Sequence, residues 1–498
     1  MDEVLSLENV ILMEKKVIEE IGIPSIVLME NASQEIFSKV VHKGENFIIY
    51  CGRGNNGGDG LALARKLILA DKKVKVVIIG DLKNTTREFK LNYNILIKIN
   101  ASMEIFQGEI DSRFISQVIE ADVVIDAIFG VGLNKEIQGL YFNVIGAINK
   151  YSKFIVSIDI PSGLDCNSGV IKNICIKANE TYTVEVYKKG FINYEASEYL
   201  GDVKVIKIGI PKEIIAEYSE GTRFLSDSEY QALIPSRKLW GHKGDYGRVL
   251  ILAGSKGFTG AAYITTEATV RTGAGLVTLV IEDKLCPILD SRLTESMTVG
   301  YSELDRIDKL IEQADVIACG PGLGSEKINI EMLNKFIVNS KCPIVLDADA
   351  LNIISKDKNL LSFIRGRGII TPHPGEMARL LGKSVAYVEE NRIDVCRNYS
   401  RENEVVTLLK GYNTLISNGQ EVMINTTGSS KMASGGMGDC LTGIITSLIG
   451  QKIGNYEGAI LGAYLHGFAG DRLGKNRYSV NGRDVIEEIP KIINEIRE

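Results

Sequence analysis

Residues 47–69 read Phe47-Ile-Ile-Tyr-Cys-Gly-Arg-Gly-Asn-Asn-Gly-Gly-Asp-Gly-Leu-Ala-Leu-Ala-Arg-Lys-Leu-Ile-Leu69. The apolar run 47–50 predicts a buried strand, and the amphipathic stretch 61–69 predicts a helix. The glycine-rich segment between them predicts a tight turn at a helix N-terminus. The unpaired backbone N–H groups there can bind a phosphate. A tight turn alone also needs glycine, but Asn55, Asn56 and Asp59 add side-chain ligands beside the glycines.

Working outward, the same alternation of apolar runs and amphipathic stretches fills the first part of the chain. Residues 8–21 predict a helix that stops at Gly22 and Pro24. Further apolar runs occur at residues 74–79, 123–125, 154–158 and 203–208. Near-continuous β-branched runs separated by helical segments indicate parallel strands buried on both faces of a doubly wound α/β sheet.

A polar connector at residues 212–226 interrupts this pattern, and a second series of apolar runs follows it. The second series comprises residues 249–253, 278–281, 316–319, 344–346, 369–370 and 405–409. A chain of 498 residues exceeds the size at which a single core keeps growing. We therefore predict two α/β domains, residues 1–217 and residues 218–498.

Composition excludes several classes of function. The net charge of -6 gives no basic footprint for nucleic acid or for an anionic membrane. The eight cysteines contain no C-x-x-C pair, so we interpret them as small buried hydrophobes rather than as disulfides or metal ligands. No signal peptide or run of transmembrane length is evident, and we expect a cytoplasmic protein.

Carboxylates follow two of the predicted strands in the first domain. Asp126 ends one strand and leads into Gly130-Val-Gly-Leu133, and Asp159 ends another and leads into Ile-Pro-Ser-Gly163. Either aspartate could simply cap the next helix. The carboxyl ends of parallel strands share one edge of a sheet, however, so both aspartates and the segment 55–59 should face one crevice.

These three motifs together resemble the NAD(P)H-hydrate epimerase domain, and the resemblance covers most of residues 1–215. It implies a Rossmann-like three-layer αβα sandwich that interconverts R and S hydrates of NADH or NADPH. The residues that would contact the hydrate are Asn55, Asn56, Gly57, Gly58, Asp59, Gly130, Val131, Gly132, Leu133, Asn134, Lys135, Glu136 and Asp159. Asn56, Asp126 and Ser162 would hold a potassium ion, and Asp159 would act at the reacting centre. Val131 departs from the family pattern, where threonine is expected.

The strongest motif of the second domain is Gly428-Ser-Ser-Lys-Met-Ala-Ser-Gly-Gly-Met-Gly-Asp439, followed by the apolar stretch 440–449. Its glycines free successive N–H groups at a helix N-terminus and predict an anion hole. Asp439 could accept the proton of an attacking hydroxyl. Helix capping alone explains the aspartate, but it does not explain the glycines before it.

Four other strand ends of this domain carry polar or glycine-rich segments. They are Gly320-Pro-Gly-Leu-Gly324, Asp347-Ala-Asp349, Thr371-Pro-His-Pro-Gly-Glu376 and Lys410-Gly-Tyr-Asn-Thr414. Together with residues 242–261 they resemble the ADP/ATP-dependent NAD(P)H-hydrate dehydratase of the ribokinase-like superfamily, from about residue 225 to the end. Met437 replaces the threonine usual between the last two glycines.

The resemblance implies the following positions. The hydrate would meet Ala261, Gly322, Gly324, His373 and Asp439. The nucleotide would meet Lys410, Gly411, Tyr412, Asn413, Thr414, Gly435, Gly436 and Gly438. Glu376 would reach Mg²⁺ through water.

The implied reaction is phosphorylation of the ring hydroxyl, followed by elimination of phosphate to restore NADH or NADPH. Its small-molecule partners would be the hydrates and ADP or ATP, and the resemblance also implies a homo-oligomer. Two alternatives stay open at this point. The second domain could be a ribokinase-type small-molecule kinase, and the first could be a non-catalytic module. Preference for NADH or NADPH, and for ADP or ATP, is not encoded in any charge pattern of these loops.

Overall fold

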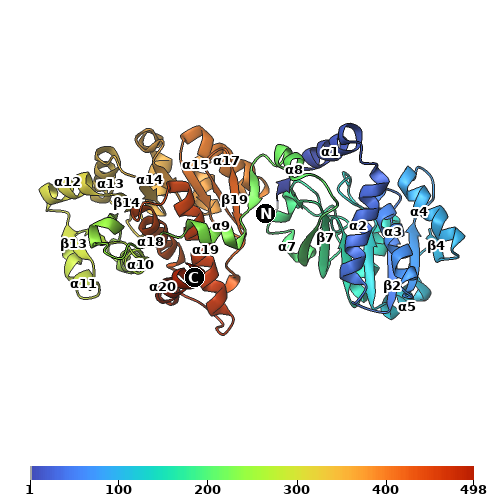
Figure 1. Ribbon diagram of the computed structural model, residues 1–498. Helices are drawn as coiled ribbons and strands as arrows, with labels where there is room; N and C mark the ends of the chain where they lie inside the picture. Colours follow the sequence, from blue (N-terminus) through green and yellow to red (C-terminus); the bar gives the residue numbers. More distant parts are fainter. Residues whose placement is uncertain (1–2, 498) are drawn as a thin grey trace. The chain divides into compact units, whose positions relative to one another are not determined.

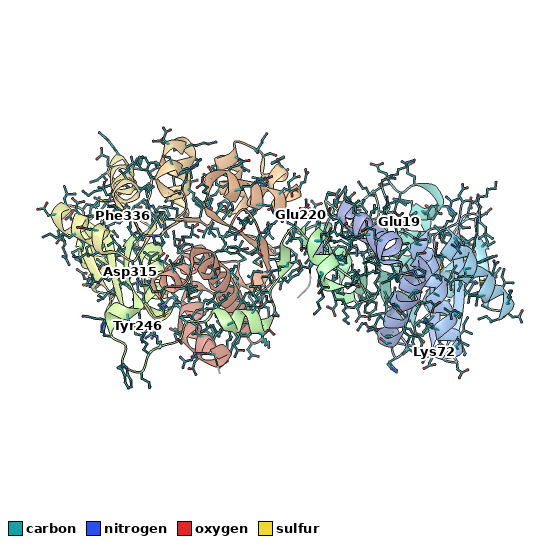
Figure 2. All side chains as sticks on the ribbon, turned by 45° about the horizontal axis from the view of Figure 1, so that its top comes forward. Glu19, Lys72, Glu220, Tyr246, Asp315 and Phe336 are labelled. Atoms are coloured by element: carbon teal, nitrogen blue, oxygen red, sulfur yellow. The ribbon has the colours of Figure 1, made fainter. Side chains whose placement is uncertain are left out.

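The computed structural model describes residues 3–497, and the chain divides into two compact units, the first ending at Thr222 and the second beginning at Arg223. Each unit is an α/β structure built on one large and mostly parallel sheet with helices on both faces (Figure 1). The predicted α/β class is therefore confirmed. Side chains fill the space between sheet and helices in both units (Figure 2).

The first unit contains a seven-stranded, all-parallel sheet in the order β4-β3-β2-β5-β6-β7-β9. Its strands are β2 (Asn46–Cys51), β3 (Lys73–Ile79), β4 (Ser102–Phe106), β5 (Val123–Ala127), β6 (Ile155–Ile158), β7 (Glu180–Val184) and β9 (Asp202–Ile206). The register pairs Asp126 with Tyr50 on one side and with Ser157 on the other. A separate two-stranded sheet joins β1 (Val4–Leu5) to β8 (Tyr187–Lys188).

Two apolar layers sandwich this sheet. One face is covered by α1 (Leu7–Lys16), the π-helical turn Val17–Ile21, α2 (Ser25–Val40), α3 (Asn55–Leu69), α4 (Arg87–Lys98) and α8 (Lys212–Tyr218). The other face is covered by α5 (Ser112–Glu120) and α6 (Gly139–Tyr151). Alternate strand residues supply the two layers, with Ile49 on the first face and Ile48 on the second. The predicted helix stop is confirmed, since Gly22 closes the turn with a φ of 85°.

The second unit contains a ten-stranded sheet in the order β10-β19-β18-β17-β16-β15-β14-β11-β12-β13. Its strands are β10 (Thr222–Phe224), β11 (Arg248–Leu252), β12 (Leu276–Ile281), β13 (Met297–Gly300), β14 (Val316–Cys319), β15 (Ile344–Leu346), β16 (Gly368–Ile370), β17 (Val406–Leu409), β18 (Thr414–Ser417) and β19 (Val422–Asn425). The strands from β13 to β17 are parallel, whereas β18 is antiparallel to both β17 and β19.

One face of this sheet is covered by α9 (Asp227–Leu233), α10 (Thr259–Arg271), α11 (Cys286–Asp290), α18 (Met437–Gly450), α19 (Asn455–Gly474) and α20 (Gly482–Arg497). The remaining longer helices are α12 (Leu304–Gln313), α13 (Lys327–Asn339), α14 (Asp349–Lys356), α15 (Pro374–Leu381), α16 (Val385–Glu390) and α17 (Arg392–Asn403). Phe336 of α13 is fully buried among them (Figure 2). The segments that begin at Asn55, Asp126 and Asp159 follow parallel strands, as the pattern predicts, whereas residues 428–439 follow β19, which pairs antiparallel with β18.

Cysteine and membrane predictions were also tested. All eight cysteines are free, and all are buried except the partly exposed Cys286 and Cys342, as expected for small hydrophobes. Within residues 3–497, no helix combines the length and the hydropathy that a membrane crossing requires.

Candidate active sites

The first unit has a cavity of about 840 Å³ at the carboxyl edge of its sheet. The cavity brings together Asn55, Asn56, Asp59, Asp159 and the loop 130–136, as predicted. Asp126, which was also expected to face this crevice, is buried and is not among its lining residues. All residues of that loop line it, including Val131 in place of the expected threonine. Gly57 and Gly58, which were predicted to contact the hydrate, are buried in α3 and are not among the lining residues.

The glycine-rich segment lies inside a helix and not in the turn that the sequence predicts. Helix α3 begins at Asn55, so the glycines occupy its first turns. A Cβ added to Gly57 would lie 2.0 Å from the carbonyl oxygen of Gly52, and one added to Gly58 would lie 2.6 Å from Met29 Cε. These glycines let α3 pack directly against neighbouring backbone and side chains. They bring Asn56 and Asp59 to the wall of the cavity, which Gly57 and Gly58 themselves do not line.

Asp126 is fully buried behind this cavity and carries a dense set of hydrogen bonds. Its Oδ1 accepts from Ser162 Oγ at 2.5 Å, and its Oδ2 accepts from Ser157 Oγ at 2.9 Å and from the Ser162 N–H at 2.9 Å. Burial nevertheless raises the pKa of Asp126. Asn56 Nδ2 donates to the carbonyl of Phe129 at 2.9 Å, while Asn56 Oδ1 is buried and has no hydrogen-bond partner within residues 3–497.

These oxygens fit a bound cation. An orphaned buried carbonyl oxygen costs free energy unless something binds it, and a monovalent metal ion accepts oxygen ligands only. Asn56 Oδ1, Ser162 Oγ and the Asp126 carboxyl are the three predicted ligands, and hydrogen bonds through the Phe129 backbone connect them. This set of oxygen donors, two neutral and one carboxylate, is compatible with a hard cation.

Asp159 is held in an uncommon backbone conformation at the edge of the cavity. Its φ is 64°, a left-handed value that aspartate tolerates better than most residues. The Val184 N–H donates to Asp159 Oδ1 at 3.1 Å, and Lys188 Nζ lies 2.8 Å from the same oxygen. The Lys188 side chain is only 1% exposed and also donates to the carbonyl of Val184 at 2.9 Å. Nothing in the sequence marked Lys188, because its role depends on the β1–β8 pairing that brings it beneath Asp159.

Glu14 is a further cavity residue that sequence reasoning missed. It belongs to α1, whose apolar periodicity drew attention only to its buried side. Glu14 lines the cavity with Asp59 and Asp159. Burial, reinforced by the charge of Asp159, raises the pKa of Glu14 and raises that of Asp59 well above its ordinary value.

In the second unit, Asp439 lies in the first turn of α18, and the glycines before it open the backbone. Gly436 caps the helix with a φ of 90°. A Cβ added to Gly435 would meet nothing within 4 Å, and one added to Gly438 would lie 3.5 Å from Lys410 Nζ. The segment is therefore open above the helix N-terminus, which matches the predicted anion hole.

Lys410 connects the carboxylates beneath this segment. Its Nζ lies 2.7 Å from Asp347 Oδ1 and 3.8 Å from Glu376 Oε2, and Thr442 Oγ1 donates to Asp347 Oδ2 at 2.8 Å. Burial disfavours the charge of Lys410, but the two carboxylates outweigh burial and its pKa is raised. Burial, together with the charge of Asp347, raises the pKa of Asp439 to about 6. With this pKa, Asp439 is half ionised at about pH 6 and mostly ionised at neutral pH.

His373 and Glu376 form the start of α15 as well as part of the site. The His373 N–H donates to Glu376 Oε2 at 2.8 Å, and the Gly375 N–H donates to His373 Nδ1 at 3.0 Å, which is a capping box. Burial lowers the pKa of His373, and Lys410 adds to this effect. The imidazole is therefore neutral at physiological pH and able to accept or donate a hydrogen bond.

The other predicted substrate residues come together through close glycine packing. A Cβ added to Gly322 would lie 2.9 Å from Ala261 Cβ, and the Gly324 N–H donates to Asp349 Oδ2 at 2.8 Å. Both glycines have positive φ values, 58° and 75°. The loops that follow β11, β14 and β15 therefore meet at one place.

The predicted nucleotide turn, residues 410–414, connects β17 to β18. Tyr412, at its tip, is 50% exposed. Arg392 is buried beneath the turn and donates to the carbonyl of Asn413 at 3.2 Å. Gly411 is required here, because a Cβ would lie 2.5 Å from Arg392 Nη1. Sequence reasoning missed Arg392, since no motif surrounds it.

Comparison with known proteins gives the same division. Residues 25–190 match the family described as YjeF-related protein N-terminus, and residues 249–491 match the family described as NAD(P)H-hydrate dehydratase. A ribokinase-like superfamily protein from Enterococcus faecalis is similar in structure to the second unit, with a TM-score of 0.53 and 29% identity over 56% of this chain and 98% of its own. This similarity confirms the predicted ribokinase-like fold.

Two full-length relatives carry the name bifunctional NAD(P)H-hydrate repair enzyme. The protein from Moorella thermoacetica is 37% identical over 96% of this chain and 94% of its own, and the Escherichia coli protein is 33% identical over 97% and 92%. These alignments cover both units. The chain belongs to the family of bifunctional NAD(P)H-hydrate repair enzymes.

Proposed function

We propose that this chain repairs hydrated NADH and NADPH, with residues 1–217 interconverting the R and S hydrates and residues 218–498 dehydrating the S form at the expense of ADP or ATP. One observation carries the proposal. Asp439 lies at the open N-terminus of α18 and has a raised pKa, beside the Lys410–Asp347 pair. Such a site suits the transfer of a phosphoryl group to a hydroxyl.

In the dehydratase reaction, Asp439 accepts the proton of the ring hydroxyl as that oxygen attacks the terminal phosphorus of the nucleotide. The free N–H groups around Gly435, Gly436 and Gly438 stabilise the charge on the transferring phosphoryl group. Phosphate then leaves with the C–O electron pair, and the ring nitrogen supplies electrons to the carbon. His373 and the loops around Ala261, Gly322 and Gly324 orient the ring. Lys410, Gly411, Tyr412, Asn413 and Thr414 hold the nucleotide.

In the epimerase reaction, the hydroxyl departs from a carbon that adjoins the ring nitrogen and returns on the opposite face. The ring nitrogen assists departure, so the protein must supply acid–base groups and hold a cationic intermediate. Asp159 supports this role because Lys188 and the Val184 N–H fix its carboxyl at the cavity wall. Asn55, Asn56, Asp59 and residues 130–136 enclose the nicotinamide end of the hydrate.

Two metal ions belong to the proposal. Asn56, Asp126 and Ser162 would hold K⁺, which would supply positive charge against the buried Asp126 carboxyl. Glu376 would reach Mg²⁺ through water, which would neutralise charge on the nucleotide phosphates. Within residues 3–497, no cluster of three or more metal-ligating His, Cys, Asp or Glu side chains exists. That finding is compatible with Mg²⁺, which usually binds one or two carboxylates and the substrate phosphates.

The resemblance carries two further proposals without separate support from the geometry: that the enzyme is cytoplasmic and that it is a homo-oligomer. The alternative reading, a small-molecule kinase with an inert first module, is not favoured. Full-length relatives share both units under the repair-enzyme name, and the first unit has a cavity of about 840 Å³ lined by Asn55, Asp59 and Asp159.

The test is recovery of absorbance at 340 nm from a mixture of R and S NADH hydrates with Mg²⁺ and ADP or ATP. We expect the wild-type chain to restore all of the NADH. Asp159→Asn should restore only the S fraction, and Asp439→Asn should restore none. Failure of the wild-type chain with every nucleotide would refute the proposal.

A further inference from the structure

Three carboxylates and one lysine meet at the cavity of the first unit. Glu14 comes from α1, Asp59 from α3, Asp159 from the end of β6 and Lys188 from β8, and these are the charged groups that act on Asp59 and Glu14 from the elements around them. Glu14, Asp59 and Asp159 all line the cavity, whereas Glu19, further along the same helical segment as Glu14, is exposed on the outer surface (Figure 2). Arg53, which pairs with Asp81, and Lys135 also line the cavity, but Lys188 is the cation that contacts a carboxylate of this cluster.

The cation is not shared equally. Lys188 Nζ lies 2.8 Å from Asp159 Oδ1, which also accepts the Val184 N–H. Neither Asp59 nor Glu14 makes an ion pair within residues 3–497. Both contacts of Asp159 are on Oδ1, so Oδ2 remains for a substrate or water.

This asymmetry separates the two aspartates chemically. Lys188 pairs with Asp159, whereas burial and the nearby negative charges of Asp159 and Glu14 raise the pKa of Asp59. The position of Asp59 near the N-terminus of α3 would ordinarily favour its charged form, but burial outweighs this effect. Two carboxyls whose environments separate their proton affinities are suited to opposite roles in one reaction.

We propose that Asp59 is the general acid and Asp159 the general base of the epimerase, and that Lys188 is the positioning residue that decides which of the two holds the proton. The inference rests on the proposed epimerase function and deepens it. Glu14 adds negative charge to the cluster and helps keep the proton on Asp59.

Epimerisation proceeds by departure of the ring hydroxyl and attack of water on the opposite face. Asp59 gives its proton to the ring hydroxyl, the C–O bond breaks, and water leaves with the bonding electrons. The lone pair of the ring nitrogen forms a C=N bond, and the carboxylates stabilise the resulting cation. A solvent water then attacks the carbon from the other face, its proton passes to Asp159, and the C=N electrons return to nitrogen. The proton returns from Asp159 to Asp59 through solvent, which leaves the enzyme unchanged.

The first test measures epimerisation of pure R hydrate in Asp59→Asn and Asp59→Glu. A missing general acid should lower kcat by about 10²- to 10⁴-fold, with KM within about threefold of wild type. Asp59→Glu, which keeps the acid, should recover at least about tenfold of that loss. We expect the kcat of the wild type to fall at alkaline pH as the general acid loses its proton. Asp59→Asn should not show this fall, because no proton donor remains to be titrated.

Controls make the result unambiguous. Dehydration of pure S hydrate by the same variants should match wild type, since that reaction uses the second unit, and Glu19→Gln should match wild type in both reactions. An Asp59→Asn variant that keeps kcat within about threefold of wild type would overturn the inference while leaving the proposed function standing. A wild-type chain that dehydrates S hydrate but cannot epimerise R hydrate would overturn the proposed epimerase function itself.

The second test addresses Lys188. Removing the ammonium group in Lys188→Met leaves Asp159 Oδ1 without its ion-pair partner, so kcat for R hydrate should fall by at least about tenfold while KM stays within about threefold of wild type. Lys188→Arg, which keeps the charge, should recover most of that loss. A Lys188→Met variant that keeps the wild-type kcat, or a Lys188→Arg variant that recovers nothing, would overturn the assignment of Lys188 as a positioning residue.

Discussion

Both units contain a glycine-rich segment before an aspartate, but the glycines have different structural roles in the two units. In α3 they lie inside the helix, where a Cβ on Gly57 would collide with the Gly52 carbonyl. At α18 they precede the helix or open its first turn, and a Cβ on Gly435 would enter free space. Glycine before an aspartate thus signals close packing in the first unit and an open anion site in the second.

The aspartates that follow the glycines are more alike than the glycines themselves. In each unit one lysine pairs with a neighbouring carboxylate, Lys188 with Asp159 and Lys410 with Asp347. The aspartate that lacks this partner, Asp59 or Asp439, has a raised pKa. The same electrostatic arrangement therefore yields a proton donor where the pKa lies far above its ordinary value and a proton acceptor where it is about 6.

The largest effect should come from Asp439→Asn. The variant keeps the size of the side chain but cannot accept a proton, so dehydration of S hydrate should fall by about 10²- to 10⁴-fold. Absorbance at 340 nm with saturating nucleotide measures it. Epimerisation of R hydrate by the same variant serves as the control and should be unchanged. Activity within about tenfold of wild type would mean that Asp439 is not the base.

The glycine contrast predicts the next largest effect. Gly57→Ala forces a Cβ against a backbone oxygen and should lower the free energy of unfolding by about 3 kcal/mol. Gly435→Ala meets no atom and should change it by no more than about 0.5 kcal/mol, while raising KM for the nucleotide because the new methyl group obstructs the phosphates. Denaturant unfolding and steady-state kinetics measure the two effects. A Gly57→Ala chain as stable as Gly435→Ala would remove the distinction between packing glycines and open ones.

Sequence reasoning located what depends on local pattern. The strands that precede the functional loops lie within one or two residues of the predicted runs, because continuous apolar stretches are hard to satisfy elsewhere. The antiparallel strands β18 and β19 were not predicted, since they are short and polar at their ends. The predicted turn at residues 51–60 proved largely helical, because close contact with Gly52 and Met29 outweighs the poor helix propensity of glycine.

The supporting residues of the sites could not be predicted from the sequence. Glu14, Lys188 and Arg392 act through tertiary placement: an N-terminal helix, a two-stranded sheet and a buried guanidinium beneath a turn. None lies in a motif, and Lys188 stands beside Lys189 with nothing in the sequence to distinguish them. Most residues that the motifs named in the first unit line its cavity, whereas the residues that set their electrostatics come from elsewhere in the chain.

The pH dependence of dehydration offers a smaller effect. A base must be ionised, and burial together with Asp347 raises the pKa of Asp439 to about 6. The rate with S hydrate should therefore be constant above about pH 7 and fall about tenfold for each pH unit below about 6. Initial rates in buffers of constant ionic strength measure the profile, with the epimerase rate of the same sample as an internal comparison. A rate that stays flat down to about pH 5 would contradict the raised pKa.

The smallest expected effect is on thermal stability. Its pH dependence at Asp59 and Asp439 should be opposite to that at a carboxyl whose pKa is lowered on folding. A carboxyl whose pKa is raised on folding stabilises the protein fully below its unfolded pKa of about 4 and loses that contribution as pH rises through the folded pKa. When the pH is raised from about 5 to about 8, the melting temperature of Asp59→Asn and of Asp439→Asn should therefore fall less than that of wild type. Calorimetry measures these melting temperatures. This difference from wild type should be larger for the Asp59 variant than for the Asp439 variant, because the pKa of Asp59 is raised well above its ordinary value whereas that of Asp439 is about 6.

Asp122 is the control for the direction in which stability changes with pH. Backbone N–H groups of Asn46 and Glu45 donate to it and lower its pKa, so its contribution is present at neutral pH and disappears as pH falls through that lowered value. Asp122→Asn should consequently be destabilised at about pH 7 and approach wild type in acid, the reverse of Asp59→Asn. If all three variants responded to pH in the same direction, the raised pKa values could not be the cause. The role of Asp59 as general acid would then lose its electrostatic basis, because nothing would favour its protonated form.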